Sequence, residues 1–236
     1  MIKKITRYSL GYIGAVCVLL WIISHSVIFP TFFVPFYRWH YQRVDASTGM
    51  DIAQTIGMTH EDLMYVTVEL LNYMRGRRDS LEGLSAHVDG HRAQRTIYEN
   101  FFTDLEIRHM VDVRVLYDRL FMLQYIALGL FLAINLALYF LKDNLVLVKC
   151  TRHVLGGFLA LAVVMTGIIS INFERAWDIF HYIFFDNDYW RLTPFRDLMI
   201  NMVPLHFFLH ISIFIGILLA VKCTFFIALS TWVLRK

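Results

Sequence analysis

The chain has 236 residues, of which 58% are hydrophobic, 16% aromatic and 17% charged, with a formal net charge of +3. Soluble domains carry roughly 25% charged residues, so the composition excludes an ordinary soluble protein and predicts a membrane protein. The long apolar stretches described next predict the all-α polytopic class. The three cysteines, Cys17, Cys150 and Cys223, lie in apolar stretches or a short loop. We therefore expect neither a disulfide framework nor a zinc site built from cysteine.

Four uncharged stretches are long enough to cross a bilayer, which takes about 20 apolar residues. They run from Tyr8 to Tyr37, between Arg119 and Lys142, between His153 and Glu174, and from near Pro204 to the C-terminus. The first could open a signal peptide, but it is longer than a usual signal core and no small-x-small cleavage site follows, which favours a retained anchor. Lys222 interrupts the last stretch, and we expect its amine to snorkel to the headgroups.

The basic residues predict the direction of the spans. In a four-span chain, all six lysines fall on one side together with Arg7, Arg152 and Arg235, whereas every acid except Asp143 falls on the other side. Cytoplasmic loops are enriched in Lys and Arg, so we expect both termini in the cytoplasm. Because the basic residues carry this topological signal, we expect no nucleic-acid partner.

Three segments follow from this topology. They are the N-terminal cytoplasmic end with the first transmembrane helix (1–37), an extracytoplasmic helical segment (38–119), and three further transmembrane helices (120–236) with a re-entrant or interfacial outer loop at 174–203.

The outer segment 38–119 shows two helical patterns. Thr59 with Asp62 three residues later is a variant of the capping box and predicts a helix start. Apolar residues then recur at helical spacing, and the helix is expected to end near Arg75 and Gly76. A second pattern begins at about Arg95 and runs with little break into the second span.

Two pairs of a histidine and an acid stand out in the outer segments. His109 and Asp112 are three residues apart and share a helix face, where a carboxylate holds an imidazole in one tautomer and makes it a better base. Asp178 and His181 repeat this spacing in reverse order. Structural interpretations also fit: Arg108 can pair with Asp112, and the polar residues after His181 can form an interfacial turn with Asx hydrogen bonds.

A third candidate is the pair His206 and His210, four residues apart in the last span. The spacing suits a metal ion, but no third ligand follows in the sequence. Structural histidines that bond a neighbouring helix fit this pair better, so we expect no metal.

Residues 109–114 (HMVDVR) and 180–190 (FHYIFFDNDYW), followed by 192–204 (LTPFRDLMINMVP), resemble the two hallmarks of the bacterial lipoprotein intramolecular transacylase (Lit) family. The resemblance covers essentially the whole chain. Members of this family, which occur in Gram-positive bacteria, act on a lipoprotein whose N-terminal Cys carries a diacylglyceryl thioether. They move the sn-2 acyl chain onto the free α-amino group, which gives the lyso-form lipoprotein.

The resemblance implies a multi-pass enzyme of the cell membrane, an acyltransferase whose active site faces the extracytoplasmic side. Its expected partners are a diacylglyceryl lipoprotein and the phospholipid bilayer, and no soluble cofactor is expected. His181 would be the general base and His109 would complete the site, although the sequence does not decide which histidine is the base. The expected substrate-binding residues are Asp112, Arg114, Asp178, Asp186, Asn187, Trp190, Arg196 and Asp197.

Among these residues, Asp112 would orient His109, and Arg114 or Arg196 would polarise the ester carbonyl. Two other functions remain open. One is a membrane lipid hydrolase or metal-dependent lipase that uses the same histidines and acids. The other is a non-enzymatic scaffold, in which both histidines would tolerate replacement by alanine.

Overall fold

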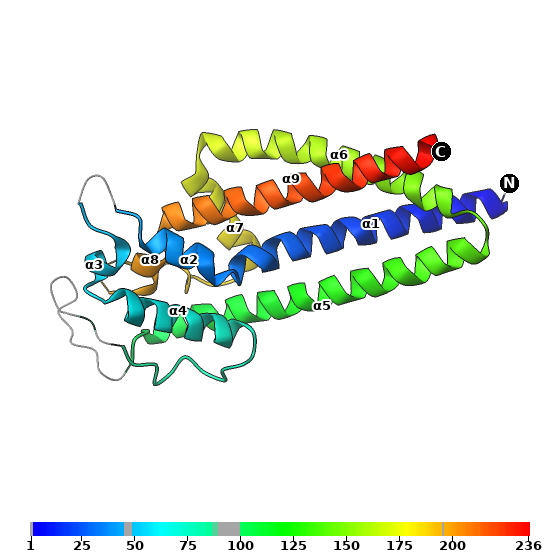
Figure 1. Cartoon of the computed structure of the whole chain (residues 1–236). Helices are drawn as coiled ribbons and strands as arrows, with labels where there is room; N and C mark the ends of the chain where they lie inside the picture. The colour runs from blue at the N-terminus through cyan, green and yellow to red at the C-terminus, as the bar shows by residue number, and fades with distance from the viewer. Residues whose placement is uncertain (1, 45–48, 87, 89–99, 195) are drawn as a thin grey trace. The chain divides into compact units, whose positions relative to one another are not determined.

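The computed structural model describes residues 2–44, 49–86, 88, 100–194 and 196–236, and every regular element among them is a helix (Figure 1). In chain order these are α1 (Ile2–Thr31), α2 (Val34–Tyr41), α3 (Ile52–Ile56), α4 (His60–Met74), α5 (Asp104–Phe140), α6 (Asn144–Ile171), α7 (Phe173–Phe184), α8 (Met199–Met202) and α9 (Leu205–Arg235). Four of them, α1, α5, α6 and α9, are long and apolar enough to cross a membrane. The predicted all-α class with four candidate spans is therefore confirmed.

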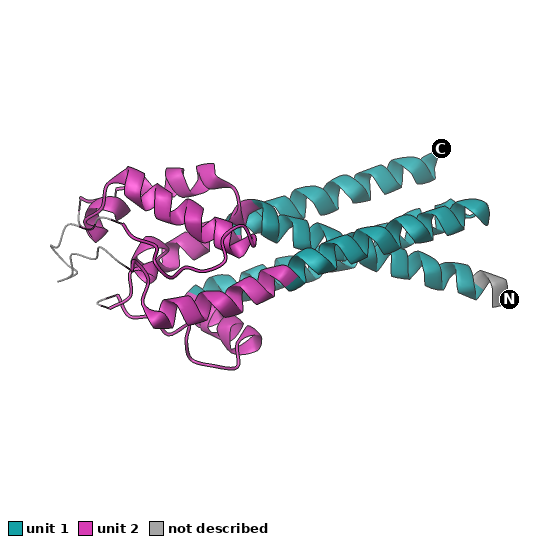
Figure 2. Ribbon diagram, turned by 90° about the horizontal axis from the view of Figure 1, so that it is seen from below, with its two compact units in different colours: residues 1–29, 119–173, 213–236 teal, residues 30–118, 174–212 magenta. Residues whose placement is uncertain are grey.

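The chain divides into two compact units that alternate along the sequence (Figure 2). Unit 1 contains Met1–Phe29, Arg119–Phe173 and Ile213–Lys236, and unit 2 contains Pro30–Asp118 and Glu174–Ser212. This division differs from the three consecutive segments expected from the sequence, because the loop region after α6 packs with residues 30–118 rather than with the spans that flank it.

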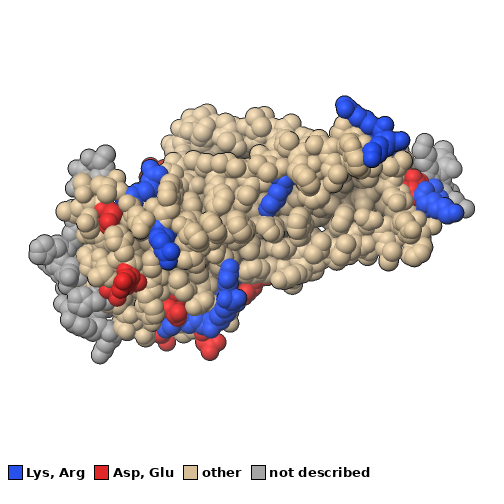
Figure 3. Space-filling view, in the orientation of Figure 1, with Lys and Arg blue, Asp and Glu red and all other residues tan. Residues whose placement is uncertain are grey.

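Unit 1 is built from the apolar parts of the four long helices. Val18 and Ile22 of α1, Leu155 of α6 and Cys223 of α9 form a buried cluster. Arg7 pairs with Asp143 at 2.9 Å, so the start of α1 lies beside the turn between α5 and α6. Both chain ends lie near this turn (Figure 1). The face of these helices seen in Figure 3 carries few charged side chains away from the chain ends, as lipid contact requires.

Lys222 does not extend to a helix end as expected. Its ammonium group donates hydrogen bonds to His25 Nδ1 at 2.7 Å and to Ser26 Oγ at 3.0 Å. An ammonium in a spanning helix needs such partners when it does not reach water. The snorkelling prediction was therefore wrong, because the sequence of α9 gives no sign of the polar pair on α1.

The first uncharged stretch is not one continuous helix to Tyr37. It breaks after Thr31, and α2 begins at Val34 with Pro35 in its first turn, where the missing N–H of proline costs no hydrogen bond. The hydroxyl of Tyr37 donates to the Thr31 carbonyl at 2.8 Å and so bridges the break. The chain thus turns into unit 2 earlier than the sequence suggested.

The predicted helix in the outer segment is confirmed. Thr59 caps α4 and accepts a hydrogen bond from the Asp62 N–H at 3.0 Å, and the helix ends at Met74, just before Arg75 and Gly76. Its apolar face is buried through Leu63, Val66, Leu70 and Tyr73. The Tyr41 hydroxyl lies 2.9 Å from Thr67 Oγ1 and joins α2 to α4.

The second outer helix begins later than predicted. Residues 95–99 lie outside the described residues, residues 100–103 are not helical, and α5 starts at Asp104. From there it continues without interruption to Phe140, so the predicted continuity with the second span is confirmed. Residues 104–118 belong to unit 2, and the rest of α5 belongs to unit 1.

Candidate functional site

The structure brings His109 of α5 and His181 of α7 together in unit 2. Their ring centroids are 6.0 Å apart, and the residues are only 8% and 5% exposed. Phe185 covers both rings, with centroid distances of 5.2 Å to His109 and 5.6 Å to His181. Two imidazoles that lie 72 positions apart in sequence thus share one apolar, water-poor environment.

The tautomer of His181 follows from its backbone partner. Nδ1 of His181 lies 2.8 Å from the carbonyl oxygen of Trp177, one helical turn earlier. A carbonyl can only accept, so Nδ1 carries the hydrogen, and Nε2 of the neutral ring holds a free lone pair. Nε2 is therefore the atom that can take a proton.

Burial keeps His181 neutral. Desolvation lowers the pKa of His181 below its ordinary value of 6.5, although the hydrogen bond to Trp177 and the negative charge of Asp178 act in the opposite direction. A neutral imidazole at physiological pH is the form that general base catalysis needs.

Aromatic rings surround His181. Trp190 stacks on its imidazole at a centroid distance of 4.6 Å and an interplanar angle of 23°, and the Trp177 ring contacts it edge-on at 4.8 Å. Arg191 lies 5.2 Å above the Trp190 ring. The orientation of His181 is thus fixed by packing as well as by its hydrogen bond.

Two buried nitrogen atoms at this site have no hydrogen-bond partner among the described residues. One is Nδ1 of His109, and the other is Nε1 of Trp190. An indole N–H can only donate, and a buried donor left without an acceptor costs about 1–3 kcal/mol. Such atoms in a cluster of ionisable side chains indicate a place where a ligand supplies the missing hydrogen-bond partner.

Asp112 and Asn187 connect α5 to the loop that follows α7. Asn187 Nδ2 donates to Asp112 Oδ2 at 2.9 Å, and Asn187 Oδ1 accepts from the Tyr189 N–H at 3.0 Å. The second bond is an Asx turn of the kind considered from sequence. Asp112 was expected to orient His109, but the hydrogen bond that the structure gives it comes from Asn187.

The two arginines expected to face the substrate have other partners. Arg114 Nη1 donates to the carbonyl oxygens of Arg78 and Asp79 at 3.3 and 3.5 Å, and its guanidinium lies 4.9 Å from the centre of the Tyr73 ring. Arg196 forms a fork of hydrogen bonds with Asp197, including Nη2 to Oδ2 at 2.9 Å.

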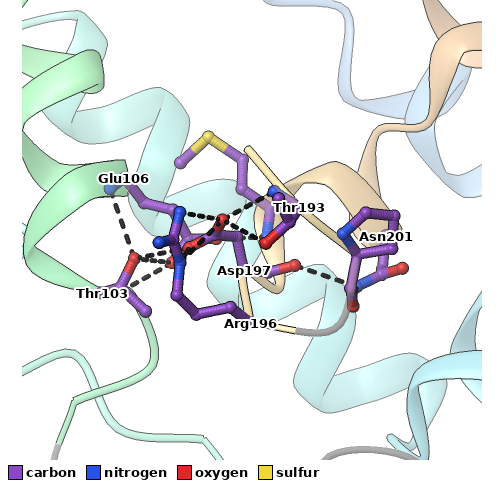
Figure 4. A network of polar contacts seen from close by, with 8 residues as sticks. Thr103, Glu106, Thr193, Arg196, Asp197 and Asn201 are labelled. Atoms are coloured by element: carbon purple, nitrogen blue, oxygen red, sulfur yellow. Dashed lines mark hydrogen bonds and ion pairs between the residues drawn. The ribbon is translucent and has the colours of Figure 1, made fainter. Parts of the chain in front are cut away.

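Asp197 belongs to a buried network that also contains Glu106, a residue missed from the sequence (Figure 4). Both carboxylates are 0% exposed. Glu106 accepts from the backbone N–H groups of Thr103 and Met199, both at 2.6 Å. Asp197 accepts from the Thr193 N–H at 2.7 Å and from Thr103 Oγ1 at 3.1 Å.

This network keeps Asp197 ionised and fixes the start of α5. Burial alone would raise the pKa of Asp197, but hydrogen bonds from Arg196, Thr193 and Thr103 and the charge of Arg196 hold it below its ordinary value. Thr103 and Glu106 form a capping box, a signal that the sequence did contain. His109 lies one helical turn after Glu106, so the network positions the imidazole through the helix.

The remaining predicted residues, Asp178 and Asp186, are exposed. The pair His206 and His210 lies with His40, another residue that the sequence did not single out, at ring centroid distances of 5.0 and 5.5 Å from it. Among the described residues, no group of three His, Cys, Asp or Glu side chains is arranged to hold a metal ion.

The sequence and the fold were compared with known proteins. A family model described as "Lipoprotein intramolecular transacylase Lit" matches residues 12–208. An uncharacterized protein of Aquifex aeolicus is 29% identical over 118 residues, which are 50% of each chain, so the chain spans about half the length of this curated relative.

Solved structures of the membrane integral lipoprotein intramolecular transacylase Lit from Bacillus cereus have a similar fold. One matches with a TM-score of 0.77 at 17% identity and covers 98% of this chain and 97% of that chain. Two forms of the same protein with a substituted histidine match with TM-scores of 0.73 and 0.71, at 16% and 17% identity, over 99% of this chain and 96% and 94% of those chains. At this level of identity the matches establish a common fold.

Proposed function

Because the chain belongs to the lipoprotein intramolecular transacylase (Lit) family, we propose that it transfers an acyl chain within one lipoprotein molecule. The substrate carries a diacylglyceryl thioether on its N-terminal Cys and a free α-amino group. The sn-2 acyl chain moves from the glyceryl oxygen to the amine, which gives the lyso-form lipoprotein. In this proposal both termini are cytoplasmic and unit 2 faces the extracytoplasmic side.

The observation that carries the proposal is the buried pair of His109 and His181, with ring centroids 6.0 Å apart. Aminolysis of an ester needs a base for the amine, a donor for the developing oxyanion and a proton for the leaving alkoxide. The pair offers both a proton acceptor and a donor. No enzyme nucleophile is needed, because the amine and the ester are already tethered in one molecule.

His181 is the better general base of the two, because the Trp177 carbonyl holds the hydrogen on Nδ1 and leaves the Nε2 lone pair free. As the amine nitrogen bonds to the ester carbon, Nε2 takes one amine proton. The imidazolium then returns this proton to the glyceryl oxygen as the C–O bond breaks. The proton balance is closed, and the histidine ends neutral.

The oxyanion of the tetrahedral intermediate needs preorganised donors. The guanidinium groups of Arg114 and Arg196 are already engaged by the carbonyls of residues 78–79 and by Asp197. The buried N–H of Trp190 has no acceptor among the described residues and sits on the ring stacked against His181. We assign it as the first oxyanion donor, with His109 as the second.

In the proposal, the other predicted substrate-binding residues shape and border the site around the two histidines. Asp112 and Asn187 hold the loop after α7 against α5 and shape the headgroup pocket. Asp197 holds the segment that follows Trp190. Asp178 and Asp186 are exposed at the rim, where they meet the polar part of the lipopeptide.

Expression in a host that makes diacylglyceryl lipoproteins tests the proposal. Mass spectrometry of the N-terminal lipopeptide should find an N-acylated product with an unchanged total number of acyl chains. His181→Ala should reduce this product to a trace, because loss of a general base typically lowers rates by roughly 10²–10⁴-fold. His153→Ala is the matched control, since His153 is an exposed histidine of α6 outside the site.

Three results would reject the proposal. One is full activity in the His181→Ala protein when it is present in the membrane at the level of the control. Another is release of free fatty acid without N-acylation, which would assign a hydrolase. The last is an unchanged lipopeptide with the original protein, as a scaffold without enzymatic activity would leave it.

A further inference from the structure

A second group of imidazoles lies in unit 2, formed by His40 of α2 with His206 and His210 of α9. The His40 ring centroid is 5.0 Å from that of His206 and 5.5 Å from that of His210, and His206 and His210 are 6.3 Å apart. His40 is 0% exposed, whereas His206 is exposed and His210 is half-buried. The group therefore joins one fully buried imidazole to two that reach the surface.

The buried imidazole lacks partners. Neither ring nitrogen of His40 has a hydrogen-bond partner among the described residues, and the same holds for Nδ1 of His210. A buried polar atom that stays without a hydrogen-bond partner is destabilising, because it loses its bonds to water and gains none in return. Three of them in two adjacent rings indicate a ligand with polar atoms rather than apolar packing.

The neighbouring charges favour an anion. Among the described residues that act electrostatically on His40, Arg43 carries a permanent positive charge, and His206 and His210 are imidazoles whose ring N–H groups can donate hydrogen bonds. The Arg43 guanidinium lies 4.9 Å over the Trp39 ring, which contacts the His210 ring at 5.9 Å. Burial and these neighbours lower the pKa of His40 to about 4, so the ring is neutral and one of its nitrogens carries a hydrogen that it can donate to an anion.

The place of the group in the chain indicates the source of the anion. α2 begins at Val34, three residues after the first candidate span ends at Thr31, and both α9 histidines lie within six residues of the start of the last candidate span. Ends of spanning helices lie at headgroup depth, where Trp is enriched. Trp39 is 48% exposed and Phe33 is 37% exposed, as expected for side chains at this depth.

We propose that His40, His206, His210 and Arg43 form a binding site for the phosphate group of a bilayer phospholipid. Imidazole N–H groups and a guanidinium are well suited to donate to phosphate oxygens, and such charge-assisted hydrogen bonds are strong. A diacylglyceryl-Cys lipopeptide carries no phosphate in its lipid part, so the site would hold a lipid other than the substrate. The proposal does not depend on the acyl transfer reaction.

Lipid binding to the purified full chain in a neutral detergent tests this proposal. Native mass spectrometry and the thermal midpoint would be followed during titration with phosphatidylglycerol, with a diacylglycerol of the same chains, and with inorganic phosphate. We expect one phosphatidylglycerol to bind, the diacylglycerol to bind at least ~10-fold more weakly, and inorganic phosphate to compete, because only the phosphate compounds can accept charge-assisted hydrogen bonds at this site.

Three variants separate the site from general lipid association. Arg43→Gln removes an exposed cation, His210→Phe removes a half-buried imidazole, and His40→Phe keeps a ring while it removes both nitrogens. Each should weaken phosphatidylglycerol binding about tenfold. Arg77→Gln, an exposed arginine elsewhere in unit 2, should bind like the original chain.

Equal binding of phosphatidylglycerol by the original chain, Arg43→Gln and His210→Phe would overturn the proposal, and so would equal binding of the diacylglycerol. Binding of inorganic phosphate without any binding of phosphatidylglycerol would overturn the proposal that the phosphate belongs to a lipid, and would assign the site to free phosphate. Stabilisation by Zn²⁺ with no effect of any phosphate compound would assign the group to a metal ion and would also overturn the proposal.

Discussion

A backbone carbonyl, rather than a carboxylate, fixes the tautomer of His181. The sequence singled out His181 because Asp178 lies three residues earlier, but the hydrogen bond to Nδ1 comes from the carbonyl of Trp177. Asp178 acts on His181 only through its charge, which raises the pKa of His181 against the larger effect of burial. The effect of Asp178 on this imidazole is therefore electrostatic.

Replacing Asp178 should move the pH dependence of the reaction. The rate falls with decreasing pH as the substrate amine, with a pKa of about 7.7–8.0, becomes protonated, and it falls more steeply below the pKa of His181. Asp178→Asn removes a negative charge that favours the imidazolium, so the pKa of His181 falls and the second break moves to lower pH. Rates of lipopeptide conversion measured from pH 4 to 9 would check this, and a break that stays in place or moves upward would contradict it.

Trp190 offers a test of the oxyanion assignment. Trp190→Phe keeps an aromatic ring on His181 but removes the buried N–H. Loss of one oxyanion donor typically lowers kcat by about 10²-fold, with little change in KM if the ground state does not use the bond. Steady-state kinetics on a synthetic lipopeptide would measure both constants. Trp232→Phe, an exposed tryptophan near the C-terminus, is the control.

An unchanged kcat in the Trp190→Phe protein would remove Trp190 from the oxyanion site. A rise in KM alone would limit Trp190 to substrate binding, the role expected from the sequence. The sequence could not predict that the Trp190 N–H lacks an acceptor, because the partners of a side chain depend on the folded structure around it.

At the scale of the helices, small residues set how closely α1 approaches its neighbours. A Cβ atom on Gly11 would lie 2.8 Å from Val146 Cγ1 and 2.9 Å from Cys150 Sγ of α6, whereas a Cβ on Gly156 would meet no atom within 4 Å. Spanning helices commonly use glycine for such close packing.

Gly11→Ala and Gly156→Ala should therefore differ in their effect on stability. The first forces α1 and α6 apart and should lower the thermal midpoint in detergent. The second gains the helix preference of alanine, roughly 0.5–1 kcal/mol, without a clash and should leave the midpoint equal or higher. Unfolding followed by fluorescence would measure both midpoints, and equal effects of the two substitutions would contradict the packing.

Sequence patterns predicted the helices well where a helix is determined by residues close together in the sequence. The four spans follow from the length of the uncharged stretches, and the start of α4 follows from the Thr59 cap. The break after Thr31 and the capping box of Thr103 and Glu106 also have local signals in the sequence. The partners of Lys222 and His40 lie on other helices, so no pattern within α9 or α2 could reveal them.

At the scale of the whole molecule, the two units are interleaved along the chain. Residues 174–212 join residues 30–118 in unit 2, which is why His109 and His181 meet although a spanning hairpin separates them in sequence. Periodicity does not encode such a pairing, and only the family resemblance suggested it. The division also separates tasks: unit 1 has the apolar surface suited to a bilayer, and unit 2 contains both groups of histidines.

The central claim is that the histidine pair moves an acyl chain within one substrate molecule, and a crossover measurement tests it most directly. Two diacylglyceryl lipopeptides would be mixed with the purified chain, one labelled with ¹³C in both its sn-2 acyl chain and its peptide, the other unlabelled. Mass spectrometry should find only fully labelled and fully unlabelled N-acyl products, and none with His181→Ala. Products with mixed labels, or labelled free fatty acid in place of an N-acyl product, would contradict the account.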